Sequence, residues 1–292
     1  KLRSKGKNTD LMVMTATPIP RSLSMTLYAD MDISSIRNKP FNRNIVETFS
    51  FPESRIKGVY NSMEKYIKQG RQIFYVLPLI EESEKIDLKS AEETFLLLKK
   101  TVFPQYKVSL LHSKIPREEK DEIMLSFRNG ETDILVSTTV VEVGIDIPNA
   151  NIMIIHHAER FGLAQIHQLR GRVGRGEHKS FCILIHPDNI GEEAKERIKI
   201  LTENSDGFSI SELDLKMRGS GQLIGTRQHG ISDFEFTDLT KDIDIILSAK
   251  KEADIILKKN ISVHSEICGI EDPHISEITK NIRKKKILAI LS

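Results

Sequence analysis

The sequence predicts an α/β fold: a doubly wound parallel sheet followed by a helical hairpin and a loop. Strand-like and helix-like hydrophobic periods alternate from residue 55 to about residue 186, the pattern of a parallel sheet covered by helices on both faces. After His186 the strand signals fade and a pair of helical periods appears. A chain of 292 residues, 39% of them hydrophobic, can bury one substantial core and a smaller appended unit.

Hydrophobic spacing predicts the first helix and the first strands. The helix is predicted from five apolar residues at helical spacing, namely Ile56, Val59, Tyr60, Met63 and Ile67. Gly70 is expected to end this helix directly before a strand at residues 72–77. The next helix is predicted at about residues 90–100, and the next strand at residues 108–111.

A proline and a glycine bound the following helix. Pro116 favours a helix start and Gly130 a helix end, and Ile123, Met124 and Phe127 lie between them on the expected inner face. The remaining elements of the predicted series are strands at residues 133–137, 152–156 and 180–185, a helix at 163–169, and the helical pair at 192–203 and 210–217.

A glycine-rich segment follows the helical pair. It spans residues 218–230, and its glycines permit close backbone approach or positive φ, which predicts a functional loop. Residues 242–258 are predicted to form a further amphipathic helix.

Composition gives no overall argument for nucleic-acid binding. Lys+Arg number 43 and Asp+Glu 41, so the net charge is +2 and any basic footprint must be local. Cys182 and Cys268 lie far apart and outside any metal-ligand spacing, which predicts buried free thiols in a reducing compartment. No run approaches the roughly 20 apolar residues of a membrane span and no signal segment is present, so we expect a cytoplasmic location and no membrane partner.

The strongest signal for chemistry is the segment Gln168-Leu169-Arg170-Gly171-Arg172-Val173-Gly174-Arg175. The guanidiniums of Arg172 and Arg175 flank a glycine-containing turn and can face one polyanion, for which a triphosphate is the natural target. During phosphoryl transfer, an arginine presented from a separate lobe can hold negative charge on the γ-phosphate oxygens once the lobes close. The alternative is a surface loop whose arginines form salt bridges.

A second signal lies at residues 135–148, where a buried strand continues into hydroxyls, a glycine and an acid. Thr138 and Thr139 at the strand end can donate hydrogen bonds to the phosphate groups of a DNA backbone. Asp146, two residues after Gly144, can accept hydrogen bonds from a ribose or from a catalytic arginine. One segment can therefore contact both DNA and nucleotide, although either threonine alone could instead cap a short helix.

A third signal is the connector after the apolar run at residues 11–14. Thr15 and Thr17 at a strand end, followed by Pro18 and Pro20, form a stiff connection that is suited to relay a change at a phosphate site to the next lobe. By itself this pattern has little specificity.

In chain order, from the connector to the arginine segment, the three segments resemble motifs III, V and VI of the superfamily 2 helicases. This resemblance implies a RecA-like sheet. Further segments resemble the RecG family, and the last of them are similar to the helical-hairpin and loop motif that couples lobe movement to translocation on duplex DNA. These further segments are Ile80–Glu84, Glu159–Gln165, Asp206–Phe208, Arg218–Gly219 and Gly225–Gln228. The family's usual Gly-Pro-Gly-Glu is here Gly219-Ser220-Gly221-Gln222, which puts a role for an acid at position 222 in doubt.

The resemblance implies four parts of the chain. Residues 1–45 are expected to hold the end of the first helicase lobe and the interlobe linker, and residues 46–188 the second RecA-like lobe. Residues 189–260 are expected to form the hairpin and loop that couple the lobes to translocation. Residues 261–292 form a tail that carries no recognised motif.

The resemblance also implies roles for individual residues. Arg172, Arg175 and Gln168 are expected to act in ATP hydrolysis, with Gly144 and Asp146 near the nucleotide. DNA contact and coupling are expected of Thr15, Thr17, Thr138, Thr139, Arg218, Arg227 and Gln228. The implied activity is ATP-dependent remodelling of branched duplex DNA, such as stalled forks and Holliday junctions, in recombination and repair.

No Gly-x-x-x-x-Gly-Lys-Ser/Thr sequence occurs in the chain. The resemblance therefore implies that ATP with Mg²⁺ is bound mainly by a preceding lobe. That first lobe and a fork-splitting wedge domain are the expected partners within the same full-length protein. We expect the chain alone to be inactive, and the full-length bacterial protein to be cytoplasmic and associated with the nucleoid.

Two alternatives stay open at this point. The transcription-repair coupling factor shares the motor and a similar coupling loop, whereas a non-catalytic module would bind only DNA or a partner. No metal site is expected, because His156 and His157 are adjacent strand residues whose side chains should face opposite ways.

Overall fold

The computed structural model describes residues 45–79, 84–139, 147–176 and 178–223, together with residues 12, 14, 15, 34, 36, 245, 248, 249 and 251. For residues 84–86, 215 and 218–223, the description covers the backbone only. The chain divides into two units, and the helices and strands named below belong to the one that comprises Lys1–Pro20 and Asp32–Thr226.

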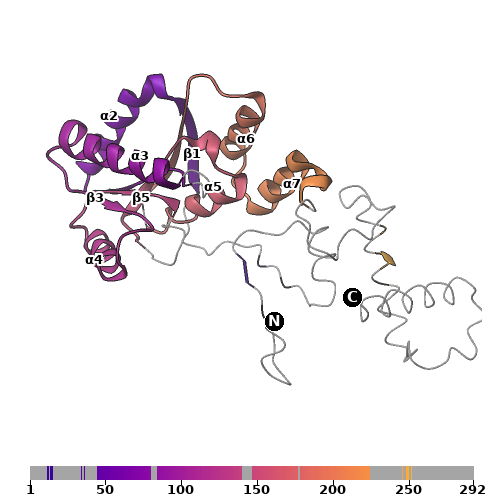
Figure 1. Cartoon of the computed structure of the whole chain (residues 1–292). Helices are drawn as coiled ribbons and strands as arrows, with labels where there is room; N and C mark the ends of the chain where they lie inside the picture. Colours follow the sequence, from indigo (N-terminus) through magenta and orange to yellow (C-terminus); the bar gives the residue numbers. More distant parts are fainter. Residues whose placement is uncertain are drawn as a thin grey trace, which may run out of the picture. The chain divides into compact units, whose positions relative to one another are not determined.

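Six parallel strands form one sheet in the described part of the chain (Figure 1). Their order across the sheet is β1-β6-β5-β2-β4-β3, and every neighbouring pair is parallel. The strands are β1 Val46–Pro52, β2 Gln72–Val76, β3 Val108–Leu111, β4 Ile134–Ser137, β5 Ala150–His156 and β6 Ser180–His186. The parallel α/β architecture predicted from the alternating periods is confirmed.

Helices connect these strands and continue beyond the last of them. Their bounds are α2 Ile56–Ile67, α3 Glu84–Leu97, α4 Arg117–Arg128, α5 Leu163–Arg170, α6 Glu192–Glu203 and α7 Gly207–Leu223. Three short turns, η2 Glu53–Arg55, η4 Leu98–Val102 and η6 Ala158–Arg160, complete the series. None of the helices in the described residues is both long and apolar enough to cross a membrane.

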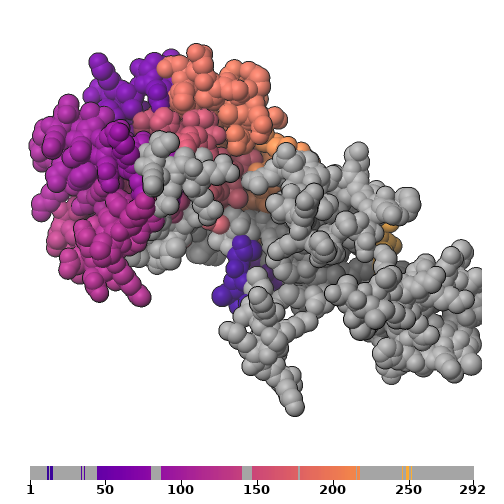
Figure 2. All heavy atoms as spheres, in the orientation of Figure 1, coloured from indigo at the N-terminus to yellow at the C-terminus, as the bar shows by residue number. Residues whose placement is uncertain are grey.

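The sheet separates two hydrophobic cores, because neighbouring residues of each buried strand face opposite sides. In β2, Ile73 and Tyr75 pack with residues of α2 and α3, whereas Phe74 and Val76 pack with residues of α4, α5 and α6. The two groups of helices accordingly cover opposite faces of the sheet (Figure 1). Helix α6 packs against β1, η6 and α5 of the same unit, and the space-filling view shows it against the neighbouring elements (Figure 2).

Strand β1 lies outside the span from residue 55 over which the sequence predicted alternating elements. Among the described strands it pairs with β6 alone, from Val46 opposite Ser180 to Pro52 opposite His186, and it is therefore the edge strand of the described sheet. Its first five residues alternate between half-buried and exposed positions. Such a strand lacks the continuous apolar run that marked the central strands, which is why its signal was weak.

Helix α7 corrects the prediction of a glycine-rich loop that begins at Arg218. The helix continues through Gly219 and Gly221 to Leu223. Each glycine costs a helix only about 1 kcal/mol relative to alanine, and the first half of α7 is held by packing of Ile210 against the core. Residues 224–230 lie outside the described residues. Further along, residues 245, 248, 249 and 251 are helical, within the helix predicted at 242–258.

Cys182 is a buried free thiol, as predicted. Burial raises the pKa of this thiol to about 12, which keeps it protonated and unreactive at neutral pH. Cys268 lies outside the described residues.

Candidate functional site

Helix α5 and the turn after it carry the predicted arginine segment. Leu163, Ile166 and Leu169 of this helix are buried in the core, which fixes the orientation of the helix. Gln168 is half-buried on the same helix. The backbone N–H groups of Gly171 and Arg172 donate to carbonyl oxygens of the last helical turn, at 3.1 and 2.9 Å, so the turn continues directly from the helix.

The two predicted arginines lie within this turn. Arg172 is half-buried and Arg175 is exposed. Between them, Gly174 has a φ of +86°, a backbone conformation that residues with a side chain rarely adopt. The Nε and Nη2 atoms of Arg175 lie 3.4 Å from the carbonyl oxygen of Gly171, which turns the guanidinium back toward the helix end.

Close backbone packing places this turn at the amino end of β5. A Cβ atom on Gly176 would lie 2.4 Å from the carbonyl oxygen of Pro148, so only glycine fits there. Pro148 ends the second predicted segment and lies two residues before β5. The structure therefore brings together the ends of the second segment and of the arginine segment.

The beginning of the second segment lies at the other edge of the sheet. Thr138 and Thr139 follow the carboxyl end of β4. Thr138 is fully buried, and its hydroxyl has no hydrogen-bond partner among the described residues, whereas Thr139 is half-buried. The two threonines and Arg175 are therefore not brought together, and Thr139 is the more accessible of the two hydroxyls.

The other predicted site residues are described in part or not at all. Gly144, Asp146, Thr17, Arg227 and Gln228 lie outside the described residues. Thr15 is exposed and belongs to no helix or strand. Arg218 lies in α7, where only the backbone is described.

Arg170 is the residue of this segment that the sequence analysis missed. It is 5% exposed, and its Nη1 donates to the carbonyl oxygens of Leu201 and Asn204 at 2.9 and 2.8 Å. Its Nη2 lies 3.0 Å from Nδ1 of His167. Burial lowers the pKa of the guanidinium. The sequence did contain a signal for the burial of Arg170. This arginine follows Leu163 by seven residues, and that spacing puts both residues on the buried face of α5.

These contacts join the arginine turn, residues 171–175 directly after α5, to the α6–α7 pair. Leu201 and Asn204 belong to the carboxyl end of α6, where backbone carbonyls lack helical partners and attract a cation. At the start of α7, a Cβ atom on Gly207 would lie 2.7 Å from Nε2 of His167. Helices α5, α6 and α7 therefore meet around the side chains of His167 and Arg170.

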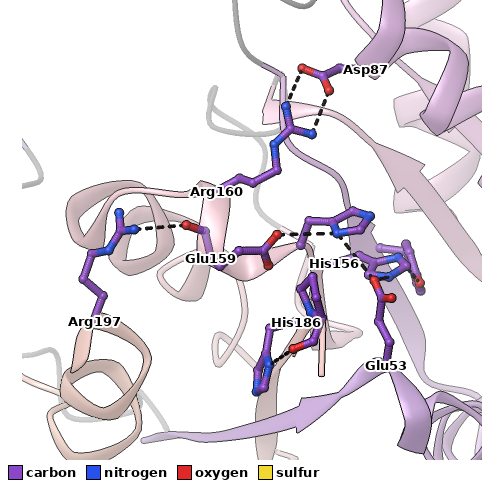
Figure 3. A network of polar contacts seen from close by, with 10 residues as sticks. Glu53, Asp87, His156, Glu159, Arg160, His186 and Arg197 are labelled. Carbon is purple, nitrogen blue, oxygen red and sulfur yellow. Dashed lines mark hydrogen bonds and ion pairs between the residues drawn. The ribbon is translucent and has the colours of Figure 1, made fainter. Parts of the chain in front are cut away.

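A second polar cluster lies at the carboxyl edge of the sheet (Figure 3). It contradicts the expectation that His156 and His157 face opposite ways, because His157 has a φ of 54° and its ring stacks on that of His156. Burial and the neighbouring His157 lower the pKa of His156. The hydrogen bond with Glu159 raises the pKa of His157. Burial acts to raise the pKa of Glu159, but its contacts with His157 outweigh this and leave it lowered.

Two family models match parts of the chain. Residues 58–177 match the helicase conserved C-terminal domain, and residues 204–288 match the C-terminal part of domain 3 of the ATP-dependent DNA helicase RecG. The first match contains the complete arginine segment, and the second begins at the end of α6 and includes α7.

Individual relatives are similar over most of the chain. The ATP-dependent DNA helicase RecG of Thermotoga maritima is 48% identical over 92% of this chain and 34% of its own length. That of Bacillus subtilis is 46% identical over 87% of this chain and 37% of its own length. A solved structure of RecG bound to a three-way DNA junction is 47% identical, with a TM-score of 0.63, over 79% of this chain and 30% of that one. The chain thus spans about a third of the length of the curated relatives it matches.

Proposed function

We propose, since this chain belongs to the RecG family of ATP-dependent DNA helicases, that it supplies the second motor lobe and the coupling element of an enzyme that remodels branched DNA. The observation that carries this proposal is the arginine turn, which is held on α5 and joined through Arg170 to the α6–α7 pair. A phosphate-sensing turn that is packed onto a second helical element is what a motor needs to convert nucleotide state into movement. The junction-bound relative supports branched DNA as the substrate.

The arginine turn fits a triphosphate that is presented from outside the chain. Arg175 is exposed and Gly174 permits close approach of the backbone, so the guanidiniums of Arg175 and Arg172 would hold the γ-phosphate oxygens. Gln168 would link this contact to DNA, with Gly144 and Asp146 near the nucleotide. ATP with Mg²⁺, held mainly by a preceding lobe, supplies the phosphoryl group that is transferred to water.

DNA contact and coupling are assigned to the other parts of the chain. Thr139 and Thr138, at the carboxyl edge of the sheet, would hold backbone phosphates, and Thr15 and Thr17 would relay the nucleotide state between lobes. Arg218, Arg227 and Gln228 would transmit lobe closure. Residues 1–45, 46–188, 189–260 and 261–292 would then be the linker, the second lobe, the coupling element and a tail.

The first test is the variant Arg175→Ala in the full-length protein. We expect kcat for DNA-stimulated ATP hydrolysis to fall by roughly 10³-fold, the scale of an arginine-finger loss, with a much smaller change in KM for ATP. The measurement is steady-state ATPase activity in the presence of a three-way DNA junction.

Arg128→Ala is the matched control, since Arg128 is also an exposed arginine at a helix end but belongs to α4. It should retain wild-type kcat. An unchanged kcat in Arg175→Ala would remove Arg175 from phosphoryl transfer. A wild-type protein that hydrolyses ATP but never separates the strands of the junction would contradict the proposed remodelling activity.

A further inference from the structure

Four side chains converge at the carboxyl edge of the sheet, where β1 and β5 end (Figure 3). The Oε1 atom of Glu53 lies 3.2 Å from Nε2 of His156 and 3.5 Å from Nδ1 of His157. The Oε1 atom of Glu159 lies 3.6 Å from the same Nδ1 atom. One ligand atom each from Glu53, His156 and His157 lies within 4.8 Å of the other two. This set has no part in the proposed ATP or DNA contacts.

The backbone at His157 creates this convergence. Its φ of 54° is left-handed, so the second imidazole turns to the same side as the first instead of to the opposite face of the sheet. The two rings stack with centroids 4.4 Å apart and planes 4° apart. A left-handed conformation costs a histidine on the order of 1 kcal/mol or more, which is the kind of local strain that often accompanies a function.

The distances from Glu53 to the two imidazole nitrogens are close to those of a tetrahedral Zn²⁺ site. With metal–ligand distances of about 2.0–2.2 Å, neighbouring ligand atoms in a tetrahedron lie about 3.3–3.6 Å apart. The Oε1 atom of Glu53 lies 3.2 and 3.5 Å from the two imidazole nitrogens, close to this range, and the three ligand atoms lie within 4.8 Å of one another. Two imidazoles with one carboxylate are a donor set that suits Zn²⁺.

The surrounding residues hold these ligands in position. The Tyr75 hydroxyl lies 3.0 Å from Nδ1 of His156, which leaves Nε2 of that ring directed at Glu53. Metal-binding histidines commonly use their second nitrogen in this way. Glu159 also has a buried oxygen, Oε2, that lacks a hydrogen-bond partner among the described residues.

The turn that carries Glu159 is itself anchored at two points (Figure 3). Arg160 donates to both carboxylate oxygens of Asp87, at 2.9 and 3.3 Å, and Nη2 of Arg197 donates to the backbone carbonyl of Glu159 at 3.2 Å. A bidentate arginine–carboxylate pair fixes orientation as well as distance. The turn beside the two histidines is therefore held in place.

We propose that Glu53, His156 and His157 bind one Zn²⁺ ion at this edge of the sheet. An imidazole nitrogen binds a metal in the plane of its ring, so the two parallel rings tilt toward each other on binding, and the less buried ring of His157 moves more. The ion links Glu53, directly after β1, to the end of β5. Three protein ligands leave the fourth position of a tetrahedral ion to water.

The test is metal titration of the 292-residue chain, with Co²⁺ as a spectroscopic substitute for Zn²⁺. We expect one Co²⁺ per chain with the intense visible absorption of tetrahedral nitrogen and oxygen ligation, and its displacement by one Zn²⁺. Zn²⁺ should also raise the melting temperature, because it binds the folded state. The variant His157→Asn keeps a residue that tolerates a left-handed conformation and removes the imidazole, and it should weaken Zn²⁺ binding at least about tenfold.

Glu53→Gln, on a separate element, should weaken binding to a similar degree, so the proposal does not depend on one variant folding. His178→Asn is the matched control, since His178 is exposed and outside the cluster, and it should bind Zn²⁺ as the wild type does. Circular dichroism identifies any misfolded variant. Wild-type affinity in both His157→Asn and Glu53→Gln, a sulfur-to-cobalt charge-transfer band, or no tetrahedral Co²⁺ spectrum would each overturn the proposal.

Discussion

At the scale of single residues, Arg170 shows how a buried charge can connect two elements. Its guanidinium donates to the carbonyl oxygens of Leu201 and Asn204 and approaches the ring of His167. The carbonyls at the end of α6 carry partial negative charge, so they stabilise the cation there. Removal of the side chain would leave two carbonyl groups without these donors.

We therefore predict that Arg170→Met destabilises the chain by on the order of 2–4 kcal/mol, since a buried polar group that loses its partner costs about 1–3 kcal/mol. Methionine conserves the side-chain length, so the loss reports the hydrogen bonds more than the packing. The free energy of unfolding in urea is the measurement. Arg128→Met, an exposed arginine in the last turn of α4, should change it by less than about 0.5 kcal/mol. Equal effects of the two substitutions would refute the role given to Arg170.

At the scale of elements, α7 begins with a strong cap. The Oδ2 atom of Asp206 accepts hydrogen bonds from the backbone N–H and the hydroxyl of Ser209, at 2.9 and 2.8 Å. The backbone N–H of Ser209 is the main cause of a lowered pKa for Asp206. The same end of the helix also packs Ile210 into the core. Capping and packing at this end explain why the helix forms although it contains three glycines.

Asp206→Ala is predicted to lower the free energy of unfolding by about 1 kcal/mol at neutral pH, the usual cost of a lost cap. Because the folded-state pKa is lowered, the charge-dependent part of this stability is present above the ordinary pKa of 3.8 and is lost as pH falls through the lower folded-state value. Urea unfolding at several pH values measures both effects. Asp206→Asn, which keeps the capping oxygen, should retain most of the neutral-pH stability but lose the acid dependence. A larger loss in Asp206→Asn than in Asp206→Ala would contradict this account.

At the scale of the whole molecule, the proposed mechanism places only one of two required lobes in this chain. It spans about a third of its relatives' length, and its sequence has no Gly-x-x-x-x-Gly-Lys-Ser/Thr segment to cradle phosphates. Arg172 and Arg175 act, in the proposed mechanism, on a triphosphate that another lobe holds. Catalysis would then depend on the closure of two lobes.

The purified 292-residue chain is accordingly predicted to lack DNA-stimulated ATPase activity. The measurement is ATP turnover at saturating junction DNA, with the full-length protein as the positive control under the same conditions. Measurable turnover by the chain, which Arg175→Ala abolishes, would mean that it carries a complete hydrolytic site.

Coupling gives a further prediction at this scale, for the double variant Arg227→Ala with Gln228→Ala in the full-length protein. We expect most DNA-stimulated ATP hydrolysis to remain while junction unwinding is lost, because hydrolysis needs a closed nucleotide cleft and translocation also needs a mechanical connection. Both rates are measured on one preparation, with circular dichroism to check folding. Proportional loss of the two activities would assign these residues to general support of the active site, and unchanged unwinding would exclude them from coupling.

The sequence by itself determined most of the sheet-and-helix series, apart from β1 and the end of α7, and it determined the family resemblance. Helices such as α2 and α5 were predictable because their buried residues repeat at helical spacing, and the central strands because both of their faces are buried and read as apolar runs. The segment that contains Arg172 and Arg175 was recognisable because its glycines and arginines are contiguous. Patterns of this kind involve residues that are close together in the sequence, so they can be recognised without a structure.

Only the tertiary structure decided which residues from distant elements meet. Arg170 finds its partners 31 and 34 residues away, and Glu53 reaches His156 across 103 residues. The sequence rule of alternating strand side chains failed at His157, because a single left-handed residue reverses the direction of the ring. Such contacts depend on the order of strands across the sheet and on individual backbone angles, and neither is encoded in local hydrophobic periods.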